Sequence, residues 1–292
     1  MKAKQRLLPL PLLAIFTVWL PLSSCEGQHP AASHHTLTDM KLPYKFDAPD
    51  KVFWLPPELV EISGLSLFEE ERYLIAVQDE WGHFFKIDRQ TGEVLPSIPF
   101  GTDGDYEGIE FVGEHLYIVN SSGTLFRLTQ PGSPQQEVKA FENFLNESYD
   151  VEGLGYDRES HSLLLVCKEH PHGKEDRMIY AFDLNTHRLG KKPVFQIQQD
   201  SIRSLSTEKI KTFKPSGIAR HPHTKDYYIL SAAADMLLVM NSEGSITHLV
   251  SLPKKQHYQP EGICFASDGT LYISDEGSKI LPASIKVFSP SD

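Results

Sequence analysis

The sequence predicts an all-β fold, a single five-bladed β-propeller, and an internal repeat is the main reason. Five times an apolar strand opens with a small or acidic residue, a glycine and an aliphatic residue. The copies are Ser63-Gly64-Leu65, Glu107-Gly108-Ile109, Glu152-Gly153-Leu154, Ser216-Gly217-Ile218 and Glu261-Gly262-Ile263. The intervals between their glycines are about 44, 45, 64 and 45 residues, and a period in the forties built from short strands is typical of propeller blades.

Each repeat continues with two further apolar runs separated by turns, which predicts a hairpin meander. The last unit is the clearest: residues 261–265 are followed by the turn Ser267-Asp268-Gly269, then by the runs 270–274 and 284–288. The turn-forming residues and the β-branched or aromatic residues of these segments both indicate strands joined by tight turns. Outer fourth strands are predicted at residues 93–98, 136–141, 193–197 and 246–252.

The last repeat has no outer strand of its own, because the chain ends at Asp292. Near the start, residues 51–55 form an apolar run that has no hairpin partner. We therefore predict that this N-terminal strand completes the last blade, which closes the ring and hides its sheet edges.

The third repeat is longer than the others by about 20 residues, and the excess is polar. Residues 198–211 carry charged side chains around Ile202, Leu205 and Ile210, a spacing that predicts a short amphipathic helix or a lid loop. A second excursion, residues 168–176, joins the middle strands of the same blade.

The first 24 residues are predicted to be a targeting signal. Lys2, Lys4 and Arg6 precede an apolar stretch that ends in Leu22-Ser23-Ser24-Cys25, which resembles a bacterial lipoprotein signal with lipidation at Cys25. An uncleaved membrane anchor is the weaker alternative, because the stretch is short and contains three prolines. Residues 25–42 then form a lipidated tether and residues 43–292 the propeller. We expect a lipid anchor in the cell envelope, preferably in the outer membrane because Glu26 follows the cysteine.

The charge of the chain argues against nucleic acid as a partner. Loss of the signal removes three basic residues and changes the net charge from −11 to about −14, whereas nucleic-acid binding calls for a basic surface. Cys167 and Cys264 lie in apolar strands of non-neighbouring blades, and we expect both to be buried free thiols.

The innermost strand of each blade lines the central channel, so the residue before each repeat glycine is predicted to face the axis. Three carboxylates, Glu107, Glu152 and Glu261, and two hydroxyls, Ser63 and Ser216, would converge there. Two positions further back, on the same face or its rim, lie Glu61, Asp105, Asp150, Lys214 and Gln259. Carboxylates this close either take up protons or gather around a cation, and an all-oxygen site suits Ca²⁺. The alternative is a solvated channel with no ion.

These motifs resemble the SdiA-regulated (YjiK-like) family over about residues 52–288. The resemblance is carried by residues 55–65, by Asp105-Tyr106-Glu107-Gly108-Ile109 and Asp150-Val151-Glu152-Gly153-Leu154, and by Pro215-Ser216-Gly217-Ile218 and Pro260-Glu261-Gly262-Ile263. It implies an exported five-bladed propeller with bound Ca²⁺ and no established reaction. It assigns the metal to Glu107, Glu152 and Glu261, with Asp105, Asp150 and Glu61 as secondary candidates. Lys214 departs from the acidic pattern, and we expect it to pair with a channel carboxylate.

Two functions remain open. The first, which we prefer, is a Ca²⁺-containing binding module that presents its channel mouth to an envelope ligand or protein. The second is a Ca²⁺-dependent hydrolase of the lactonase or phosphoesterase type, by analogy of fold alone. An enzyme of that type needs a poised base beside the metal. The candidate bases are loop histidines such as His170 and His172, no histidine precedes a repeat glycine, and no catalytic residue is assigned.

Overall fold

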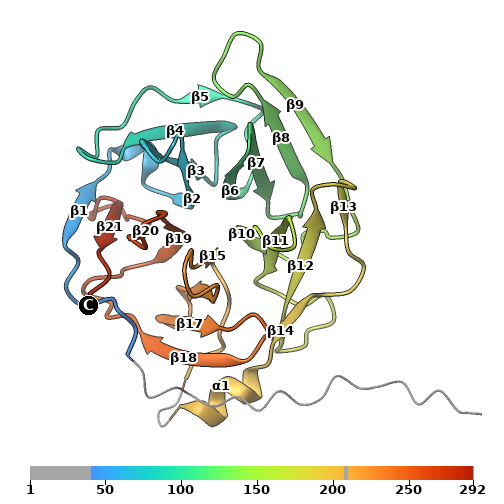
Figure 1. Cartoon of the computed structure of the whole chain (residues 1–292), viewed down its shortest axis with the longest axis vertical. Helices are drawn as coiled ribbons and strands as arrows, with labels where there is room; N and C mark the ends of the chain where they lie inside the picture. The colour runs from blue at the N-terminus through green and yellow to red at the C-terminus, as the bar shows by residue number, and fades with distance from the viewer. Residues whose placement is uncertain (1–40, 207–209, 292) are drawn as a thin grey trace, which may run out of the picture. The chain divides into compact units, whose positions relative to one another are not determined.

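The computed structural model describes residues 41–206 and 210–291, and these form five antiparallel sheets arranged as a β-propeller (Figure 1). The predicted signal, Cys25 and nearly all of the predicted tether lie outside the described residues. Within the described part of the chain, no helix is both long enough and apolar enough to cross a membrane. The predicted fold class is confirmed.

The first two blades are four-stranded meanders, hydrogen-bonded in chain order from the channel outward. The strands of blade one are β2 (Ile62–Phe68), β3 (Tyr73–Gln78), β4 (His83–Asp88) and β5 (Ile98–Pro99). Those of blade two are β6 (Tyr106–Val112), β7 (His115–Asn120), β8 (Leu125–Thr129) and β9 (Glu137–Phe141). In Figure 1 the innermost strands surround the centre and the outer strands form the perimeter.

Blade three has a divided outer strand and carries the insertion. Its strands are β10 (Val151–Asp157), β11 (Ser162–Cys167), β12 (Arg177–Asp183), β13 (Arg188–Leu189) and β14 (Phe195–Ile197). Both β13 and β14 pair with β12. The insertion begins with the helix α1 (Gln199–Leu205), which confirms the helical reading of this segment. Buried Ile202 packs the helix against the cluster between blades three and four.

Blades four and five complete the ring. Blade four contains β15 (Gly217–Arg220), β16 (Tyr227–Ser231), β17 (Met236–Met240) and β18 (Ile246–Ser251). Blade five contains β19 (Pro260–Phe265), β20 (Leu271–Asp275), β21 (Ser284–Phe288) and, as its outer strand, β1 (Lys51–Trp54). Strand β1 pairs antiparallel with β21, as predicted for closure, and a short 3-10 helix (Pro57–Leu59) leads from it into blade one.

The outer strand of blade one is shorter than predicted. Instead of a strand over residues 93–98, the structure has an isolated bridge between Val94 and Ile87 and the short β5. Pro96 has no N–H to donate to a ladder, and it interrupts the pairing between these two points.

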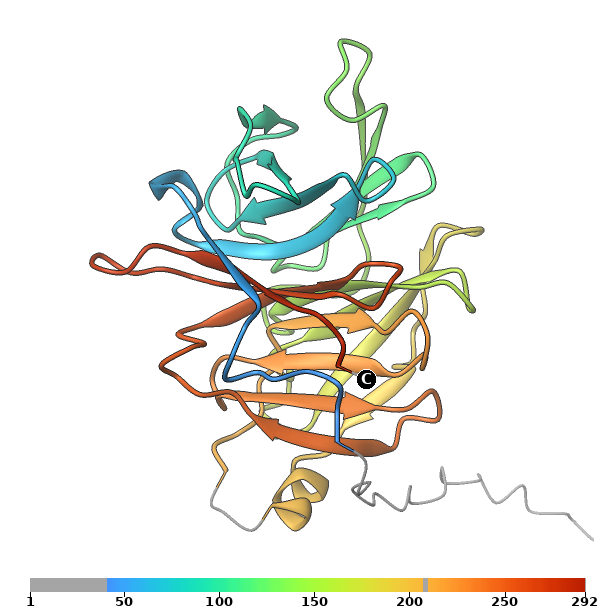
Figure 2. The same ribbon diagram turned by 60° about the vertical axis from the view of Figure 1, so that its left-hand side comes forward.

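The hydrophobic core is divided among the gaps between neighbouring blades. Five clusters of buried side chains each join two adjacent sheets, which Figure 2 shows stacked face to face. The segment before β1 takes part, since Tyr44 and Phe46 pack with Phe288 of blade five. Phe53 and Leu55 are buried between blades five and one. The N-terminal strand thus contributes core side chains as well as backbone hydrogen bonds.

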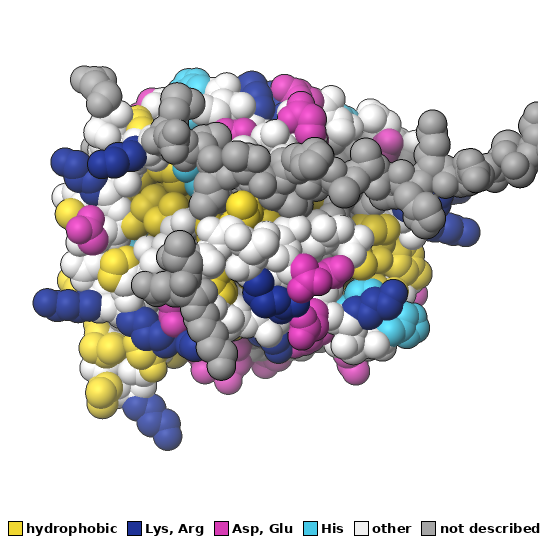
Figure 3. Space-filling view, turned by 90° about the horizontal axis from the view of Figure 1, so that it is seen from below, with side chains coloured by type: hydrophobic (Ala, Val, Ile, Leu, Met, Phe, Trp, Pro, Cys, Tyr) yellow, Lys and Arg dark blue, Asp and Glu magenta, His cyan; other side chains and the backbone are white. Residues whose placement is uncertain are grey.

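One face of the fold, seen in Figure 3, carries acidic and basic side chains interspersed with hydrophobic ones. Mixed charges of this kind cancel over short distances. This face therefore does not present a field of a single sign to a charged partner.

The repeat glycines allow the innermost strands to approach one another closely. A Cβ at Gly108 would lie 2.5 Å from Cβ of Leu154, and one at Gly64 would lie 2.7 Å from the backbone nitrogen of Ile109. Distances this short leave no room for a side chain. The glycine of the repeat is therefore required by the packing of neighbouring blades around the axis.

Candidate functional site

A β-bulge orients the residue before the repeat glycine. The pairing register shifts between Tyr106 and Gly108 in blade two and between Val151 and Gly153 in blade three. Blades one and five show the same irregularity at their repeat glycines. A bulge leaves one residue out of the ladder and turns its side chain. In blades two and three the residues left out are Glu107 and Glu152.

The three carboxylates predicted for the channel lie close enough to repel one another. Burial is the main reason that the pKa of Glu107 is raised to about 10, and the charges of Glu152, Asp105 and Glu261 add to it. The pKa of Glu261 is raised well above the ordinary range by burial and then by Glu152. Glu152 and Glu261 are each 8% exposed. The charges of Glu152 and Glu261 therefore act on Glu107, while their role as metal ligands stays a prediction.

Lys168 supplies a positive charge that the sequence analysis did not anticipate. It follows β11, and its Nζ lies 2.6 Å from Oε1 of Glu152 and 4.0 Å from Oδ2 of Asp150. Burial raises the pKa of Glu152 although Lys168 opposes the change. Lys168 thus neutralises part of the negative charge of the channel carboxylates, whereas Glu107 and Glu261 form no ion pair with any residue that the structure describes.

A second group of carboxylates extends the cluster. Burial raises the pKa of Asp79 to about 7, with the charges of Glu61, Glu80 and Asp105 as further causes. The pKa of Glu276 is raised to about 8 by burial and by Asp79 and Glu61. The Oδ1 atom of Asp79 is buried and has no hydrogen-bond partner among the described residues. Asp79 and Glu276 are not among the site residues that the sequence predicted; the signal that could have indicated them is an acidic residue directly after the second strand of the blade.

The two serines do not face the carboxylates as hydroxyl donors. Ser216 Oγ donates to the carbonyl of Pro260 at 2.7 Å, and Ser63 Oγ to the carbonyl of Glu61 at 3.4 Å. These hydroxyls bond to the backbone of the innermost strands. Their part in the repeat is therefore structural.

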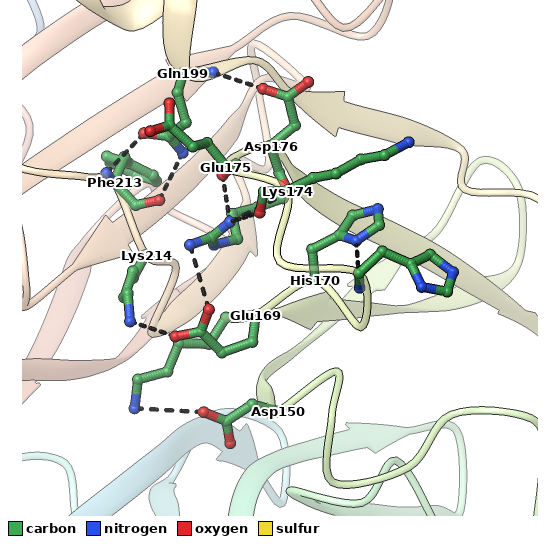
Figure 4. Close-up of polar contacts among 12 residues, drawn as sticks. Asp150, Glu169, His170, Lys174, Glu175, Asp176, Gln199, Phe213 and Lys214 are labelled. Carbon is green, nitrogen blue, oxygen red and sulfur yellow. Dashed lines mark hydrogen bonds and ion pairs between the residues drawn. The ribbon is translucent and has the colours of Figure 1, made fainter.

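Lys214 pairs with Glu169 of the loop 168–176, and not with a carboxylate of an innermost strand (Figure 4). Glu169 also accepts from Arg177, at 3.4 Å. We expected Lys214 to pair with a carboxylate of the channel. It does pair with a carboxylate, but with that of Glu169, which the loop 168–176 places beside it. The sequence alone does not place a loop of this length.

Hydrogen bonds join the loop 168–176 to the insertion, and the two segments together form one wall at the end of the channel that holds the carboxylates (Figure 4). The backbone N–H of Gln199 donates to Oδ1 of Asp176 at 3.1 Å. The Gln199 side chain makes two hydrogen bonds with the backbone of Phe213, at 2.8 and 2.9 Å. Gln199 is 2% exposed, so these bonds fix the start of α1 against the segment that leads into blade four.

The loop histidines do not complete a catalytic pair with the channel carboxylates. Nδ1 of His170 accepts from the backbone N–H of His172 at 3.1 Å. Burial lowers the pKa of His170, so the imidazole is neutral near pH 7. No histidine is among the groups that perturb Glu107, Glu152 and Glu261.

The donor chemistry of the cluster fits a hard cation, but its side chains are not arranged around one. Oxygen atoms of several carboxylates and the unpartnered Oδ1 of Asp79 are suitable ligands for Ca²⁺. Among the described residues, however, no group of three or more His, Cys, Asp or Glu side chains is placed so that it could hold a metal ion. Binding would require side-chain movement, chiefly of Lys168 away from Glu152.

Comparisons with known proteins agree with the fold. A family model described as SdiA-regulated matches residues 55–280, whereas no curated protein matches the sequence. Among solved structures, the chain is similar to Myxococcus xanthus glutaminyl cyclase, with a TM-score of 0.60, 11% identity, and coverage of 84% of this chain and 97% of that chain. It is similar to a luciferin-regenerating enzyme, with a TM-score of 0.52, 11% identity and coverage of 83% and 95%. At such identities the likeness shows the fold alone.

Proposed function

The chain belongs to the SdiA-regulated family, and from this premise we propose that it is a lipid-anchored binding module of the bacterial cell envelope, with Ca²⁺ in its channel. The channel mouth and the wall formed by the loop 168–176 and the insertion would contact the ligand or protein partner. The outer membrane is the preferred location of the anchor, through Cys25.

The observation that carries the Ca²⁺ part of the proposal is the group of carboxylates with raised pKa values. Ionised, they repel one another in surroundings of low dielectric; protonated, they lose their charge at neutral pH. A divalent cation removes both costs, because it neutralises two charges and accepts several oxygen ligands. Glu107, Glu152 and Glu261 are the proposed ligands, with Asp105, Asp150 and Glu61 as secondary candidates.

We predict that Ca²⁺ stabilises the protein and that Glu107→Gln weakens this effect. Ligand at about 100 times its dissociation constant adds about 2.7 kcal/mol to the free energy of unfolding, which corresponds to a rise of about 5–10 °C in the melting temperature of a domain of this size. Glu107→Gln should weaken Ca²⁺ binding at least tenfold in calorimetry. Glu137→Gln, on the exposed outer strand β9, is the matched control and should bind as the wild type does. If neither Ca²⁺ nor chelator changes the melting temperature, the proposal is contradicted.

The pH dependence of stability gives a second readout of the same experiment. The pKa values of Glu276 and Glu107, about 8 and about 10, lie above the ordinary value of 4.5. Between pH 4.5 and the raised pKa of each group, the folded chain binds more protons than the unfolded chain. The free energy of unfolding therefore falls as pH rises through this range. Bound Ca²⁺ favours the ionised form and should flatten this fall. Urea unfolding at pH 6 and pH 8.5, with Ca²⁺ and with chelator, measures both slopes.

The hydrolase alternative has less support. A metal-dependent hydrolase needs a base beside the metal, and no histidine of the described residues is among the main groups that act on Glu107, Glu152 and Glu261. The enzymes among the similar structures share only the fold. We therefore retain binding as the proposed function.

We also predict that export and anchoring depend on Cys25. Cys25→Ser removes the thiol that a lipid would modify, so the variant should accumulate as an unprocessed precursor or leave the membrane fraction. Detergent fractionation followed by mass spectrometry of the N-terminus measures this. Ser24→Ala, which keeps a small residue before the cysteine, is the control. Unchanged partition of Cys25→Ser into the membrane contradicts the lipid anchor.

A further inference from the structure

A recess of about 520 Å³ lies at one end of the innermost strands, opposite to the end that carries the carboxylate cluster. Its lining comes from the ends of β2, β6, β10, β15 and β19 and from the turns that follow them. The carboxylate cluster lies where these strands begin, so the recess is separated from it by the length of the strands. A volume of this size suits a small organic ligand.

The recess exists because the repeat places small residues at its floor. Three positions after the residue that precedes each repeat glycine, the five blades carry Ser66, Glu110, Gly155, Ala219 and Cys264. All of these except Gly155 line the recess. Four of the five side chains are small or absent, and Glu110 is the one long polar group at this level.

Glu110 is a partly buried carboxylate, and no ion pair to it is present among residues 41–206 and 210–291. Its Oε2 accepts from Ser66 Oγ at 2.7 Å, and its Oε1 accepts from the backbone N–H of Tyr156 at 3.2 Å. Burial raises its pKa to about 7 in spite of these bonds, and no basic residue is among the groups that perturb it. A carboxylate can accept about four hydrogen bonds, so Glu110 keeps acceptor capacity toward the recess.

The basic residues of the lining are engaged elsewhere or lie at its rim. Arg220 forms ion pairs with Asp157 and Glu159. Lys225 donates to the carbonyl of Pro222 at 2.5 Å, and Arg158 is exposed. No ion pair between Glu110 and any of these three residues is present in the described part of the chain.

Aromatic rings form the apolar walls. Phe68 and Phe111 pack edge to face with ring centroids 4.5 Å apart, and Tyr156 and Phe265 also line the recess. Faces of aromatic rings attract organic cations through their quadrupole. A carboxylate at the floor and rings around it are together the surroundings that bind an ammonium group on an apolar body.

Three consecutive glutamates form a turn at the mouth of the recess, and two of them are paired with basic residues, Glu69 with Lys86 and Glu71 with Arg89. Glu69, Glu70 and Glu71 are consecutive residues with φ of 50°, 54° and 65°, a left-handed conformation that is costly for residues other than glycine. Glu71 holds this turn in place, because it accepts from Ser267 N at 2.7 Å and pairs with Arg89 at 2.9 Å. The turn keeps three carboxylates beside the opening.

We propose that this recess binds a small organic cation, an amine or guanidinium on an apolar body, with its charged group on Glu110 and its body against Phe68 and Phe111. Of the five glutamates in the lining, Glu69, Glu71 and Glu159 are ion-paired with Lys86, Arg89 and Arg220, so an anion placed at the floor would meet chiefly the carboxylate of Glu110. A metal ion would find too few oxygen ligands at the floor. The site is independent of the proposed Ca²⁺ site.

Phenethylamine is the probe, with 2-phenylethanol and phenylacetate as its neutral and anionic counterparts. Isothermal titration of the full-length chain should show binding of the amine, and at least tenfold weaker binding of the alcohol and the acid, since a hydrogen bond to a charged group contributes about 1.5–3 kcal/mol. Glu110→Gln, which keeps the shape, should weaken amine binding at least tenfold. Glu137→Gln removes the same charge from exposed β9 and should leave it unchanged.

Phe111→Leu provides a second variant in case Glu110→Gln fails to fold, which its melting curve would reveal. Loss of the ring should weaken amine binding several-fold while the melting temperature stays close to that of the wild type. The proposal is overturned if the wild type does not bind phenethylamine at 10 mM or binds the alcohol equally well. It is also overturned if the folded variants bind the amine as the wild type does.

Discussion

A chain that begins at Pro56 is expected to aggregate, whereas a chain that begins at Lys41 is expected to keep the melting temperature of the full-length protein. The shorter chain lacks β1, so β21 becomes an exposed edge that can pair with another molecule. It also loses Tyr44, Phe46, Phe53 and Leu55 from the core. Each large apolar side chain contributes about 1.5–3 kcal/mol by burial, and their sum reaches the whole stability of a typical domain, about 5–15 kcal/mol.

A chain that begins at Ala48 is the matched intermediate. It keeps β1 but loses Tyr44 and Phe46, together with the hydrogen bond of 2.7 Å from Tyr44 to the carbonyl of Gly269. It should melt at a lower temperature and remain soluble, because the last blade keeps its outer strand. Size-exclusion chromatography and thermal unfolding distinguish the three chains. Equal melting temperatures for the chains that begin at Lys41 and Pro56 would show that closure by β1 contributes nothing.

Replacement of Lys168 by Met is expected to destabilise the protein without Ca²⁺ and to tighten its binding of Ca²⁺. Removal of one partner of a buried ion pair costs about 3–5 kcal/mol. The Lys168 side chain is 35% exposed and that of Glu152 is 9% exposed, so solvent screening reduces the expected loss to about 2 kcal/mol. Without the lysine the channel carboxylates lack their internal counter-ion. We expect Ca²⁺ to bind about tenfold more tightly, or by about 1.4 kcal/mol.

Lys214→Met is the control for this variant. Lys214 and its partner Glu169 are 35% and 37% exposed, and an exposed pair of this kind contributes at most about 1 kcal/mol. Its loss should leave Ca²⁺ affinity nearly unchanged. Urea unfolding and calorimetric titration at pH 8 measure both effects. If Lys168→Met binds Ca²⁺ no more tightly than the wild type, Lys168 does not compete with the ion.

The sequence predicts the main carboxylates of the candidate site but not the basic residues that neutralise them. Glu107, Glu152 and Glu261 recur at one position of a repeat, so equivalence among blades was sufficient to bring them to one axis. Lys168 takes the position after the second strand that Asp79 and Glu276 occupy in blades one and five, and its backbone N–H bonds to Asp150 as theirs bond to Glu61 and Gln259. The repeat therefore gives its place in the blade, whereas its pairing with Glu152 depends on where the two side chains point.

Glu110 was missed because the alternation of side chains along its strand is interrupted. Strict period two from Glu107 gives Ile109 and Phe111 as the neighbours on its face. The bulge at Glu107 is followed by a shift of register, and Glu110 then lines the recess. A bulge depends on pairing with the adjacent strand, and the glycine that permits it gave no reason to expect one.

The sequence by itself determined the five blades and the closing role of residues 51–55, placed three glutamates at one position of the repeat, and left the insertion open between a short helix and a lid loop. Each follows from local pattern: turn residues, apolar alternation, and the repetition of one motif at one interval. Only the tertiary structure decided how the charges are paired, with Lys168 on Glu152 and Lys214 on Glu169, and that Glu110 lies at the floor of a recess, where Ser66 and the backbone of Tyr156 donate to it. Charge pairing depends on the positions of side-chain atoms to within a few ångströms, both between adjacent strands of one blade, as for Lys168 and Glu152, and between segments 45 residues apart, as for Lys214 and Glu169. A pattern of residue types does not specify those positions.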